Sequence, residues 1–466
     1  MKTVYRNLDD VFAAANIESG ASLSFHHHLR DGDAVFNAVA EMLLKRKTEH
    51  LSLFPSSVFP CHTGLLQLLE KGAVHNLTTN YISGSVARHL GMHGLSGTLT
   101  MQSHGGRARA LIAKESKVDV AFIAAPAVDR EGNVTGTLGK AACGSLGYGV
   151  EDAIHADRVV ALTDTVLERI EAPQIPGKHI DEIVVVERIG AASGIMSGTT
   201  HPTEDPVGVK IARSAYTLIR TLGLIEDGFS FQTGAGGISL AVNAHMHRHL
   251  REHHVKAAFI SGGITRYHVK MLEEGLVDRL YDVQCFDTDA IRSLRENERH
   301  IAISASDYAN PDNPKRVIKD LGVVILGAAE VDLEFNVNVT TDSYNNIIGG
   351  SGGHSDTAED AAVTIIVAPL LRGRTPLITN KVTTVTTPGK DVDCLVTERG
   401  IAINARRRDL IDRCRRNGVD VMTIQELMET AHAFSGVPKK KVYKGRAYGV
   451  VHDRRGEPLD RLYTKR

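Results

Sequence analysis

The sequence predicts an α/β protein built from two related domains in tandem. Its 466 residues are about three times the length of a typical domain. Hydrophobic residues make up 42% and charged residues 23% of the chain, a composition typical of soluble globular proteins that excludes disordered, fibrous and coiled-coil classes. Apolar runs alternate with helical patterns, and one residue pattern recurs far along the chain.

An internal repeat indicates the duplication. Val128-Asp129, followed by Asn133-Val134, recurs as Val331-Asp332, followed by Asn336-Val337, at an offset of 203 residues without gaps. At the same offset LLEKGAV (68–74) corresponds to MLEEGLV (271–277). One offset that serves two separate blocks is the signature of a repeated unit. We therefore expect an N-terminal domain over residues 1–205 and a C-terminal domain over 206–466, joined within 189–206.

Each half combines strand and helix patterns. Apolar runs at 118–126 and 321–329 are typical of buried parallel strands. Residues 237–254 and 268–275 predict helices, the second ending at a glycine of the kind that closes helices. Strands that alternate with helices imply mainly parallel sheets flanked by helices.

Charge and cysteine usage restrict the function. The net charge of −1 excludes a general polyanion-binding protein, although residues 401–466 carry 16 Lys and Arg against 8 Asp and Glu. The basic run at 405–416 predicts an exposed helix face, with docking of an acidic partner as the alternative. Five scattered cysteines without a C-x-x-C pair favour neither disulfides nor a structural zinc site. An acidic N-terminus and the lack of long apolar runs predict a cytoplasmic protein without membrane segments.

Three glycine-rich segments are candidate ligand loops, at residues 143–149, 232–237 and 347–356. Glycine allows backbone N–H groups to approach a phosphate, a carboxylate or a developing oxyanion without interference from Cβ. Tight turns without a ligand explain any single loop equally well. Neither a dinucleotide fingerprint nor a G-x-x-x-x-G-K-[ST] phosphate loop is present.

Three consecutive histidines, His26 to His28, form a second candidate site. Successive side chains of an extended strand point to opposite faces, so the three cannot share one metal ion, and we expect no metal site. Anion binding by one or two of them together with Arg30 or Arg107 is more plausible, and packing roles are the alternative.

Six motifs occur in an order that resembles the citrate lyase alpha chain family, within the CoA-transferase-like superfamily. They are SFHHHLRDGD (24–33), SHGGR (103–107), CGSLGYG (143–149), FQTGAGGISLAV (231–242), EVDLEFNVNV (330–339) and GGSGGHSDTA (349–358). VAPLLRGRTP (367–376) and DCLVTERGIAIN (393–404) extend the resemblance over nearly the whole chain. It implies two CoA-transferase-like domains, in agreement with the repeat.

The resemblance implies a transferase that exchanges acetyl for citryl on the thioester of an acyl carrier protein and releases acetate. It implies two partners, a beta chain that cleaves the citryl thioester and a gamma chain that is the carrier protein. It also implies a larger complex that contains several copies of this chain. No cofactor is expected to bind directly, because the CoA-like prosthetic arm of the carrier is a substrate. The basic residues of 401–466 are a candidate surface for an acidic carrier.

One departure from the superfamily bears on the mechanism. Glutamate-type CoA-transferases use an enzyme glutamate as nucleophile, whereas residues 259–272 of this chain contain no carboxylate. This favours direct attack by a citrate carboxylate in a ternary complex. A stand-alone CoA-transferase for another di- or tricarboxylate with free CoA, and a non-catalytic ligand-binding protein of the same fold, are the alternatives.

The motifs supply candidate site residues of three kinds. Backbone N–H groups for the thioester or oxyanion are expected at Gly234, Gly236, Gly237, Gly349, Gly350, Gly352 and Gly353. Citrate is expected to contact His27, His104, Arg107 and Asn336. His354 is expected to be a polar or cationic catalytic group. Glu330 is the remaining candidate nucleophile; the alternative, which we favour, is that it orients Asn336 or a glycine loop.

Overall fold

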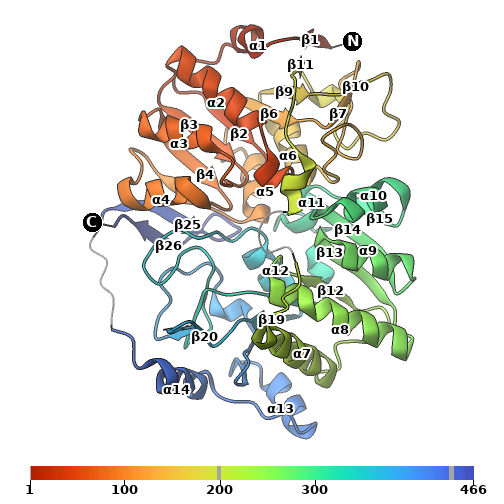
Figure 1. Cartoon of the computed structure of the whole chain (residues 1–466), viewed down its shortest axis with the longest axis vertical. Helices are drawn as coiled ribbons and strands as arrows, with labels where there is room; N and C mark the ends of the chain where they lie inside the picture. Colours follow the sequence, from red (N-terminus) through yellow and green to blue (C-terminus); the bar gives the residue numbers. More distant parts are fainter. Residues whose placement is uncertain (1, 197–200, 440–444, 466) are drawn as a thin grey trace.

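The computed structural model describes residues 2–196, 201–439 and 445–465. Two large sheets, each flanked by helices, lie one above the other in Figure 1, with the N-terminal half at the top. The expected mixed α/β fold with mainly parallel sheets is confirmed. No helix of these described ranges is long and apolar enough to cross a membrane.

The first sheet contains ten strands and is parallel except for its last pair. In spatial order they are β1 (Thr3–Tyr5), β11 (Glu182–Val185), β9 (Arg158–Thr163), β6 (Val120–Ala124), β2 (Ser22–Phe25), β3 (Leu51–Pro55), β4 (Val74–Thr79), β5 (Leu99–Met101), β25 (Ala447–His452) and β26 (Pro458–Tyr463). The helices of this half are α1 (Leu8–Ala14), α2 (Val35–Arg46), α3 (Thr63–Glu70), α4 (Gly84–His93), α5 (His104–Ile112) and α6 (Gly147–His155).

The second sheet contains eight strands, of which the last pairs antiparallel. They are β15 (His300–Ala302), β14 (Val277–Cys285), β13 (Ala257–Ile264), β12 (Ser230–Thr233), β16 (Val323–Leu326), β19 (Val363–Val367), β23 (Cys394–Val396) and β24 (Ile401–Ile403). Its helices are α7 (Pro206–Thr221), α8 (Gly237–His253), α9 (Arg266–Glu273), α10 (Thr288–Glu296), α11 (Ala305–Ala309), α12 (His354–Asp360), α13 (Arg408–Arg416) and α14 (Ile424–Ser435).

The two sheets share one topology. The order β11-β9-β6-β2-β3-β4-β5 in the first sheet matches β23-β19-β16-β12-β13-β14-β15 in the second, strand for strand along the chain. Each half adds a small three-stranded sheet: β10 (Val166–Leu167), β7 (Ala127–Asp129) and β8 (Val134–Thr135), or β18 (Val337–Asn338), β17 (Glu330–Asp332) and β22 (Ile378–Thr379). The repeat seen in the sequence is therefore a repeat of the fold.

The repeated Asp and Asn residues build the same turn twice. Asp129 Oδ1 accepts hydrogen bonds from the backbone N–H of Glu131 and Asn133, and the Asn133 amide donates to Asp129 Oδ2 at 2.9 Å. Asp332 and Asn336 repeat this pattern, with the amide contact at 3.1 Å. An aspartate that caps backbone donors two and four residues ahead is a local turn device. The motif shared by the two halves is thus structural.

The strands and helices that the sequence patterns predict are present in the structure. The apolar run at 118–126 contains β6 and the run at 321–329 contains β16, and both strands are buried throughout. The helical pattern at 237–254 is α8, which ends at His254 in the left-handed conformation. Gly275 follows α9 with φ +73°, a conformation that glycine adopts without strain.

The domain boundaries differ from the expectation at one place. α7 begins at Pro206 after the N-cap Asp205, near the expected boundary, and residues 197–200 of the expected connection lie outside the described residues. The hairpin β25–β26, however, pairs with β5 and extends the sheet of the first domain, although its sequence position assigns it to the second. The edge of β5 offers unpaired backbone groups, and a returning strand satisfies them.

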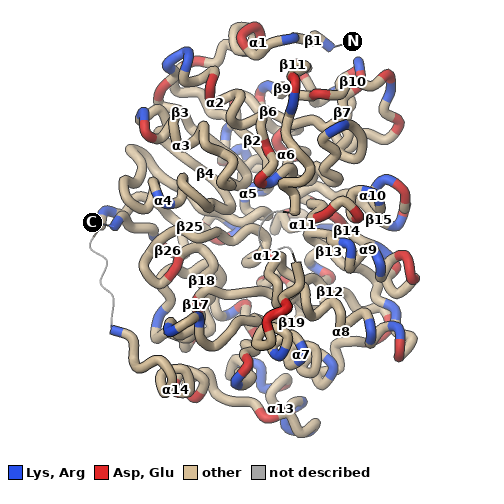
Figure 2. Tube along the Cα trace, viewed as in Figure 1, with Lys and Arg blue, Asp and Glu red and all other residues tan. Residues whose placement is uncertain are grey.

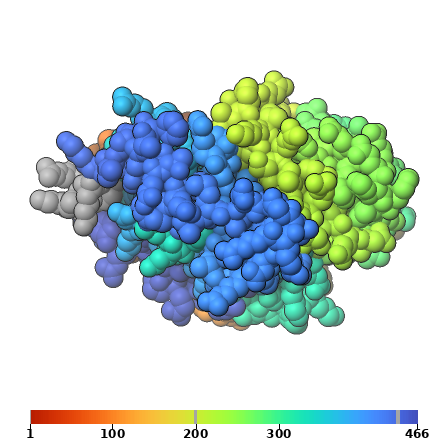
Figure 3. All heavy atoms as spheres, turned by 90° about the horizontal axis from the view of Figure 1, so that it is seen from below, coloured from red at the N-terminus to blue at the C-terminus, as the bar shows by residue number. Residues whose placement is uncertain are grey.

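The basic helix α13 lies beside α7 on the lower face of the molecule (Figure 3). Figure 2 shows both basic and acidic residues along it, and Asp409 and Asp412 pair with the N-cap Arg407 and with Arg415. The positive charge of this region is therefore partly neutralised within the helix.

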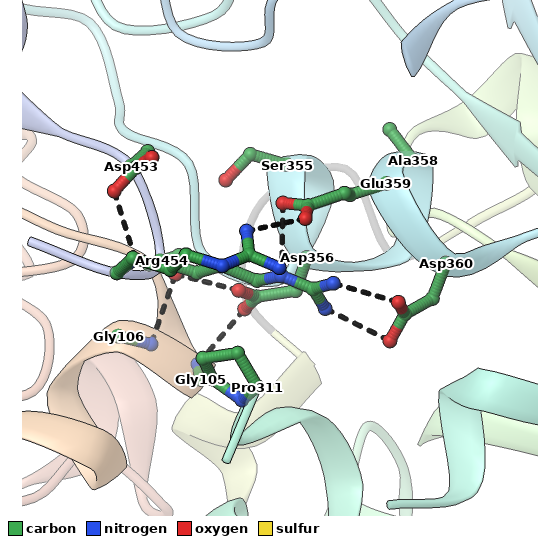
Figure 4. Close-up of polar contacts among 12 residues, drawn as sticks. Gly105, Gly106, Pro311, Ser355, Asp356, Ala358, Glu359, Asp360, Asp453 and Arg454 are labelled. Carbon is green, nitrogen blue, oxygen red and sulfur yellow. Dashed lines mark hydrogen bonds and ion pairs between the residues drawn. The ribbon is translucent and has the colours of Figure 1, made fainter. Parts of the chain in front are cut away.

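Arg454 fastens the C-terminal hairpin to the second domain (Figure 4). Its side chain is 2% exposed, and its two terminal nitrogens lie 2.8 and 2.6 Å from the carboxylate oxygens of Asp360. Its Nε lies 2.9 Å from Glu359. Arg316 also donates to Asp360, and the two guanidinium groups hold the pKa of that carboxyl near about 2 although burial opposes this. The hairpin thus connects the first sheet to α12.

We expect Arg454→Ala to lower the free energy of unfolding by about 3 kcal/mol, because it breaks a buried ion pair and removes one cationic partner from each of Asp360 and Glu359. Urea unfolding measures the change. Arg461→Ala, at an exposed position of the same hairpin, is the matched control and should change the value by about 0.5 kcal/mol or less. Equal effects of the two variants would contradict a specific role of Arg454.

Candidate active site

A cavity of about 490 Å³ lies between the two domains, beyond the carboxyl ends of their strands. The first domain lines it with His27, Arg30, Ser57, Phe59, Tyr81, His104 and Tyr148. The second domain contributes the glycine loops after β12 and before α12, the ends of β13, β14 and β16, and single side chains that include Gln232, Tyr308, His354 and Arg372. Most of the residues expected from the motifs therefore meet in one place.

The glycine loop at 349–353 makes backbone contacts with the opposite domain. The N–H groups of Ile82 and His104 donate to the carbonyls of Gly349 and Gly352 at 3.2 and 2.9 Å. A Cβ on Gly350 would lie 2.2 Å from the carbonyl oxygen of Asn80, so only glycine fits there. This loop is both a wall of the cavity and a domain contact.

The equivalent loop of the first domain, residues 143–149, makes the reciprocal contact. Ser145 Oγ donates to the carbonyl of Asp282 at 2.8 Å, and a Cβ on Gly144 would meet the Cys285 sulfur at 2.1 Å. Of this loop only Tyr148 lines the cavity. The interface between the domains is thus approximately two-fold symmetric, like that of a dimer.

Several glycine N–H groups remain available for a ligand. Gly234 and Gly352 already donate to the carbonyls of Ile325 and Asn80. Within the described ranges, no protein acceptor is recorded for the N–H of four cavity glycines: Gly236, Gly349, Gly350 and Gly353. Gly237 begins α8 and is not part of the cavity lining. Two loops from one domain therefore offer backbone donors to the same cavity.

The three consecutive histidines divide into different roles. His26 and His28 stack at 3.9 Å, and both bond to the backbone of Ala124 at the end of β6. His27 points to the cavity and stacks on Tyr148 at 4.5 Å. Two of the three rings are thus structural and one faces the cavity. No group of three metal-binding side chains occurs in the part of the chain that the structure describes.

His104 is a neutral hydrogen-bond donor. Its Nδ1 accepts from the Asn80 amide at 2.9 Å, so the ring proton resides on Nε2. Burial, assisted by the charge of Arg107, lowers the pKa of His104 to about 3. Burial also lowers the pKa of His27 well below its usual range, with contributions from His104 and Arg30. Both rings are therefore uncharged at neutral pH.

Asp356 of α12 holds His104 in place from the other domain. Its carboxylate accepts hydrogen bonds from Ser103 Oγ at 2.6 Å and from the N–H of Gly105 at 2.9 Å, at the start of α5 (Figure 4). Burial raises the pKa of Asp356 to about 7. Asp356, three positions after the glycine loop at 349–353, thus fixes α5, the helix that carries His104.

Two arginines supply positive charge to the cavity. Arg30 lies between the rings of Phe59 and Phe286, 5.4 and 4.8 Å from their centroids, and has a φ of +50°. This left-handed conformation is rare for arginine, and the guanidinium lies against Phe286 of the second domain. Arg372 donates to the carbonyl of Ala328 at 2.5 Å. Arg30 was considered from the sequence, whereas Arg372 was missed although it lies in the motif LRGRTP.

Three of the expected side chains do not line the cavity: Arg107, Asn336 and Glu330. Arg107 forms a buried ion pair with Asp152 and does not line the cavity. Asn336 belongs to the turn of Asp332, and its amide oxygen accepts from Gly389. Glu330 is 2% exposed and accepts from Asn338 and Thr383, so it orients those residues and not Asn336.

His354 lines the cavity but is not cationic. Its Nε2 donates to the carbonyl of Gly327 at 2.9 Å and its Nδ1 accepts from Thr387 Oγ1 at 2.8 Å. Burial lowers its pKa to about 4. Both ring nitrogens are therefore occupied, and the ring connects α12 to the end of β16.

No carboxylate, lysine or thiol belongs to the described lining of the cavity. The polar groups there are guanidinium, imidazole and backbone N–H donors together with hydroxyls and amides. Such a set suits a ligand with several carboxylates and the stabilisation of an oxyanion.

The pH dependence of stability provides a test of the neutral His104. A base with a lowered pKa in the folded state binds its proton only after unfolding, so its burial costs stability as pH falls from about 6.5 toward 3. Between pH 6.5 and 4.5, the free energy of unfolding of the wild type should fall, relative to that of His104→Gln, by up to about 1.4 kcal/mol for each pH unit. Urea unfolding at several pH values measures this difference. A difference independent of pH would contradict the assignment.

Comparisons with known proteins show the family of this chain. The family described as citrate lyase, alpha subunit (CitF) matches residues 1–464. The citrate lyase alpha chain of Escherichia coli (strain K12) is 40% identical over 455 residues, 97% of this chain and 89% of that protein. The Haemophilus influenzae protein of the same name is 39% identical over 98% of this chain and 92% of its own length.

Solved structures show the same relationship. A Streptococcus mutans protein assigned as the alpha subunit of citrate lyase, in complex with citrate, has a TM-score of 0.97 and 40% identity, over 100% of this chain and 92% of that chain. The alpha subunit of a malonate decarboxylase from Acinetobacter baumannii shares the fold, with a TM-score of 0.67 and 13% identity, over 94% of this chain and 93% of that chain. This chain belongs to the citrate lyase alpha subunit family and is an acyl-transferase subunit of citrate lyase.

Proposed function

We propose that the chain exchanges acetyl for citryl on a thioester by direct attack of a citrate carboxylate, without a covalent enzyme intermediate. The observation that carries this proposal is the composition of the cavity, whose described lining contains cations and hydrogen-bond donors but no carboxylate or thiol. An enzyme of the glutamate type needs a carboxylate at this place.

The first step forms one bond and breaks one. A carboxylate oxygen of citrate attacks the acetyl carbonyl, and the C–S bond breaks to give a thiolate and an acetyl–citryl anhydride. The thiolate then attacks the citryl carbonyl of the anhydride and expels acetate, which leaves the citryl thioester. One thioester and one free carboxylate product or substrate stand on each side of the reaction, so no external energy source is required. Both substrates must stay bound together, and a cavity between two domains can hold them side by side.

Each step passes through an oxyanion, and the proposed donors to it are the backbone N–H groups of Gly236, Gly350 and Gly353, which line the cavity and have no acceptor among the described residues. One such donor is typically worth about 3 kcal/mol of transition-state stabilisation. Arg30 and the Nε2 proton of His104 are suited to the remaining carboxylates of citrate. Neutral histidines serve this purpose well, because they donate without adding a charge that must be desolvated.

The partners follow from the same proposal. A gamma chain with a CoA-like prosthetic arm would present the thioester, and a beta chain would cleave the citryl thioester, within a larger complex that contains several copies of this chain. The exposed arginines of α13 are the candidate docking surface for an acidic carrier, although Asp409 and Asp412 neutralise part of their charge. No further cofactor enters this scheme.

The test is acyl transfer from acetyl-CoA or the acetylated carrier to citrate, with mass spectrometry of the product and of the intact protein. We expect citryl thioester, free acetate and an unmodified enzyme, also after treatment with hydroxylamine or borohydride during turnover. Malonate, malate and tricarballylate in place of citrate define the acid preference. An adduct on the protein, or transfer to another acid alone, would refute the proposal.

Gly236→Val should reduce transfer at least a hundredfold and leave the fold intact. A Cβ at this position meets no atom closer than Ser239 Oγ at 4.0 Å, so a valine projects into the cavity at little cost to stability. The thermal midpoint and the circular dichroism spectrum should match the wild type. Retained transfer in a folded variant would exclude this loop from the reacting centre.

A further inference from the structure

The two arginines of the cavity occupy different depths. Arg30 is half-buried between two aromatic rings, whereas Arg372 is exposed although it lines the cavity. Ile348, 42% exposed, is the only other exposed residue of the described lining. Since all other lining residues are buried or half-buried, Arg372 and Ile348 mark the mouth of the cavity.

The guanidinium of Arg372 is held at the mouth by the protein itself. Arg372 lies on the hairpin formed by β20 (Leu371–Arg372) and β21 (Thr375–Pro376), which pair antiparallel. Its hydrogen bond to Ala328 fixes the head group over the end of β16. Partial burial lowers the pKa of Arg372, but a guanidinium remains charged at neutral pH. Among the described residues it forms no ion pair.

A fixed cation without an acidic neighbour predicts an anionic ligand. The two proposed substrates, citrate and the thioester donor, differ in where their negative charge lies. The carboxylates of citrate are a few bonds apart, so all of them stay with the reacting carboxylate near the glycine loops. A thioester on a pantetheine-type arm carries its phosphates at the end far from sulfur. With the acyl group at the glycine loops, those phosphates remain at the mouth.

We propose that Arg372 binds a phosphate group of the thioester donor at the mouth of the cavity, while Ile348 contacts the apolar part of the arm. This inference rests on the proposed function, because it assigns the two ends of the cavity to the two substrates. The same phosphate chemistry is available from free CoA and from the prosthetic arm of a carrier protein. An Arg–phosphate contact is typically bidentate, which suits a guanidinium already oriented by a backbone carbonyl.

Calorimetric titration of the chain with CoA and with pantetheine, which lacks phosphate, tests the proposal without any turnover. The wild type should bind CoA at least tenfold more tightly than pantetheine. Arg372→Ala should weaken CoA binding about tenfold and leave pantetheine binding unchanged, and Arg372→Lys should recover part of the loss. Arg374→Ala is the matched control, since this exposed arginine lies two positions away but outside the cavity lining.

The outcomes separate the two proposals. Equal binding of CoA and pantetheine by the wild type, an equal loss in Arg374→Ala, or a loss for both ligands in Arg372→Ala would each overturn the role of Arg372. In transfer assays, an Arg372→Ala variant with a larger KM for citrate and an unchanged KM for the thioester donor would also overturn the role of Arg372. A larger KM for acetyl-CoA alone, or for the acetylated carrier as well, identifies which donor supplies the phosphate. Loss of transfer in the wild type with intact CoA binding would refute only the proposed reaction.

Discussion

Backbone-to-backbone contact between the two domains is the constraint on which the site depends. The loop before α12 can lie against Asn80 and His104 only because glycine leaves no Cβ in the gap. The same contact lines the cavity, orients His104 and leaves the N–H groups of Gly349, Gly350 and Gly353 without an acceptor among the described residues. The reciprocal contact of Gly144 with β14 fixes the opposite side. A duplicated fold that packs through equivalent loops thus produces one cleft from two similar halves.

This arrangement also determines the electrostatics of the cleft. The closely packed domains exclude water from the histidines, and burial keeps His27, His104 and His354 neutral. Acidic groups near the site, such as Asp152 and Asp356, are turned away from the cavity and used to hold Arg107 and the start of α5. The described lining of the cavity thus contains two arginines and no carboxylate. An anionic substrate then replaces water, and not a protein carboxylate, when it binds.

The sequence was informative wherever local pattern decides structure. The repeat at one offset revealed the duplication, and the glycine loops and His104 did come together at the cavity. The roles of Arg107 and Asn336 were not predictable, because each is decided by its partner: Asp152 lies far along the chain from Arg107, and Asn336 belongs to a turn whose function is structural. Arg372 was missed for the same reason, since only the packing of β20 and β21 brings it to the cavity.

The position of the hairpin β25–β26 in the first sheet has a consequence for biosynthesis. The edge of β5 stays uncovered while the whole second domain is translated, because β25, which pairs with it, is followed in the chain only by β26. An open edge of this kind is a site for misassembly. Arg454 reaches α12 only when that strand has been added. Chains interrupted before the hairpin therefore lack the last two strands of the first sheet and the connection of that sheet to α12.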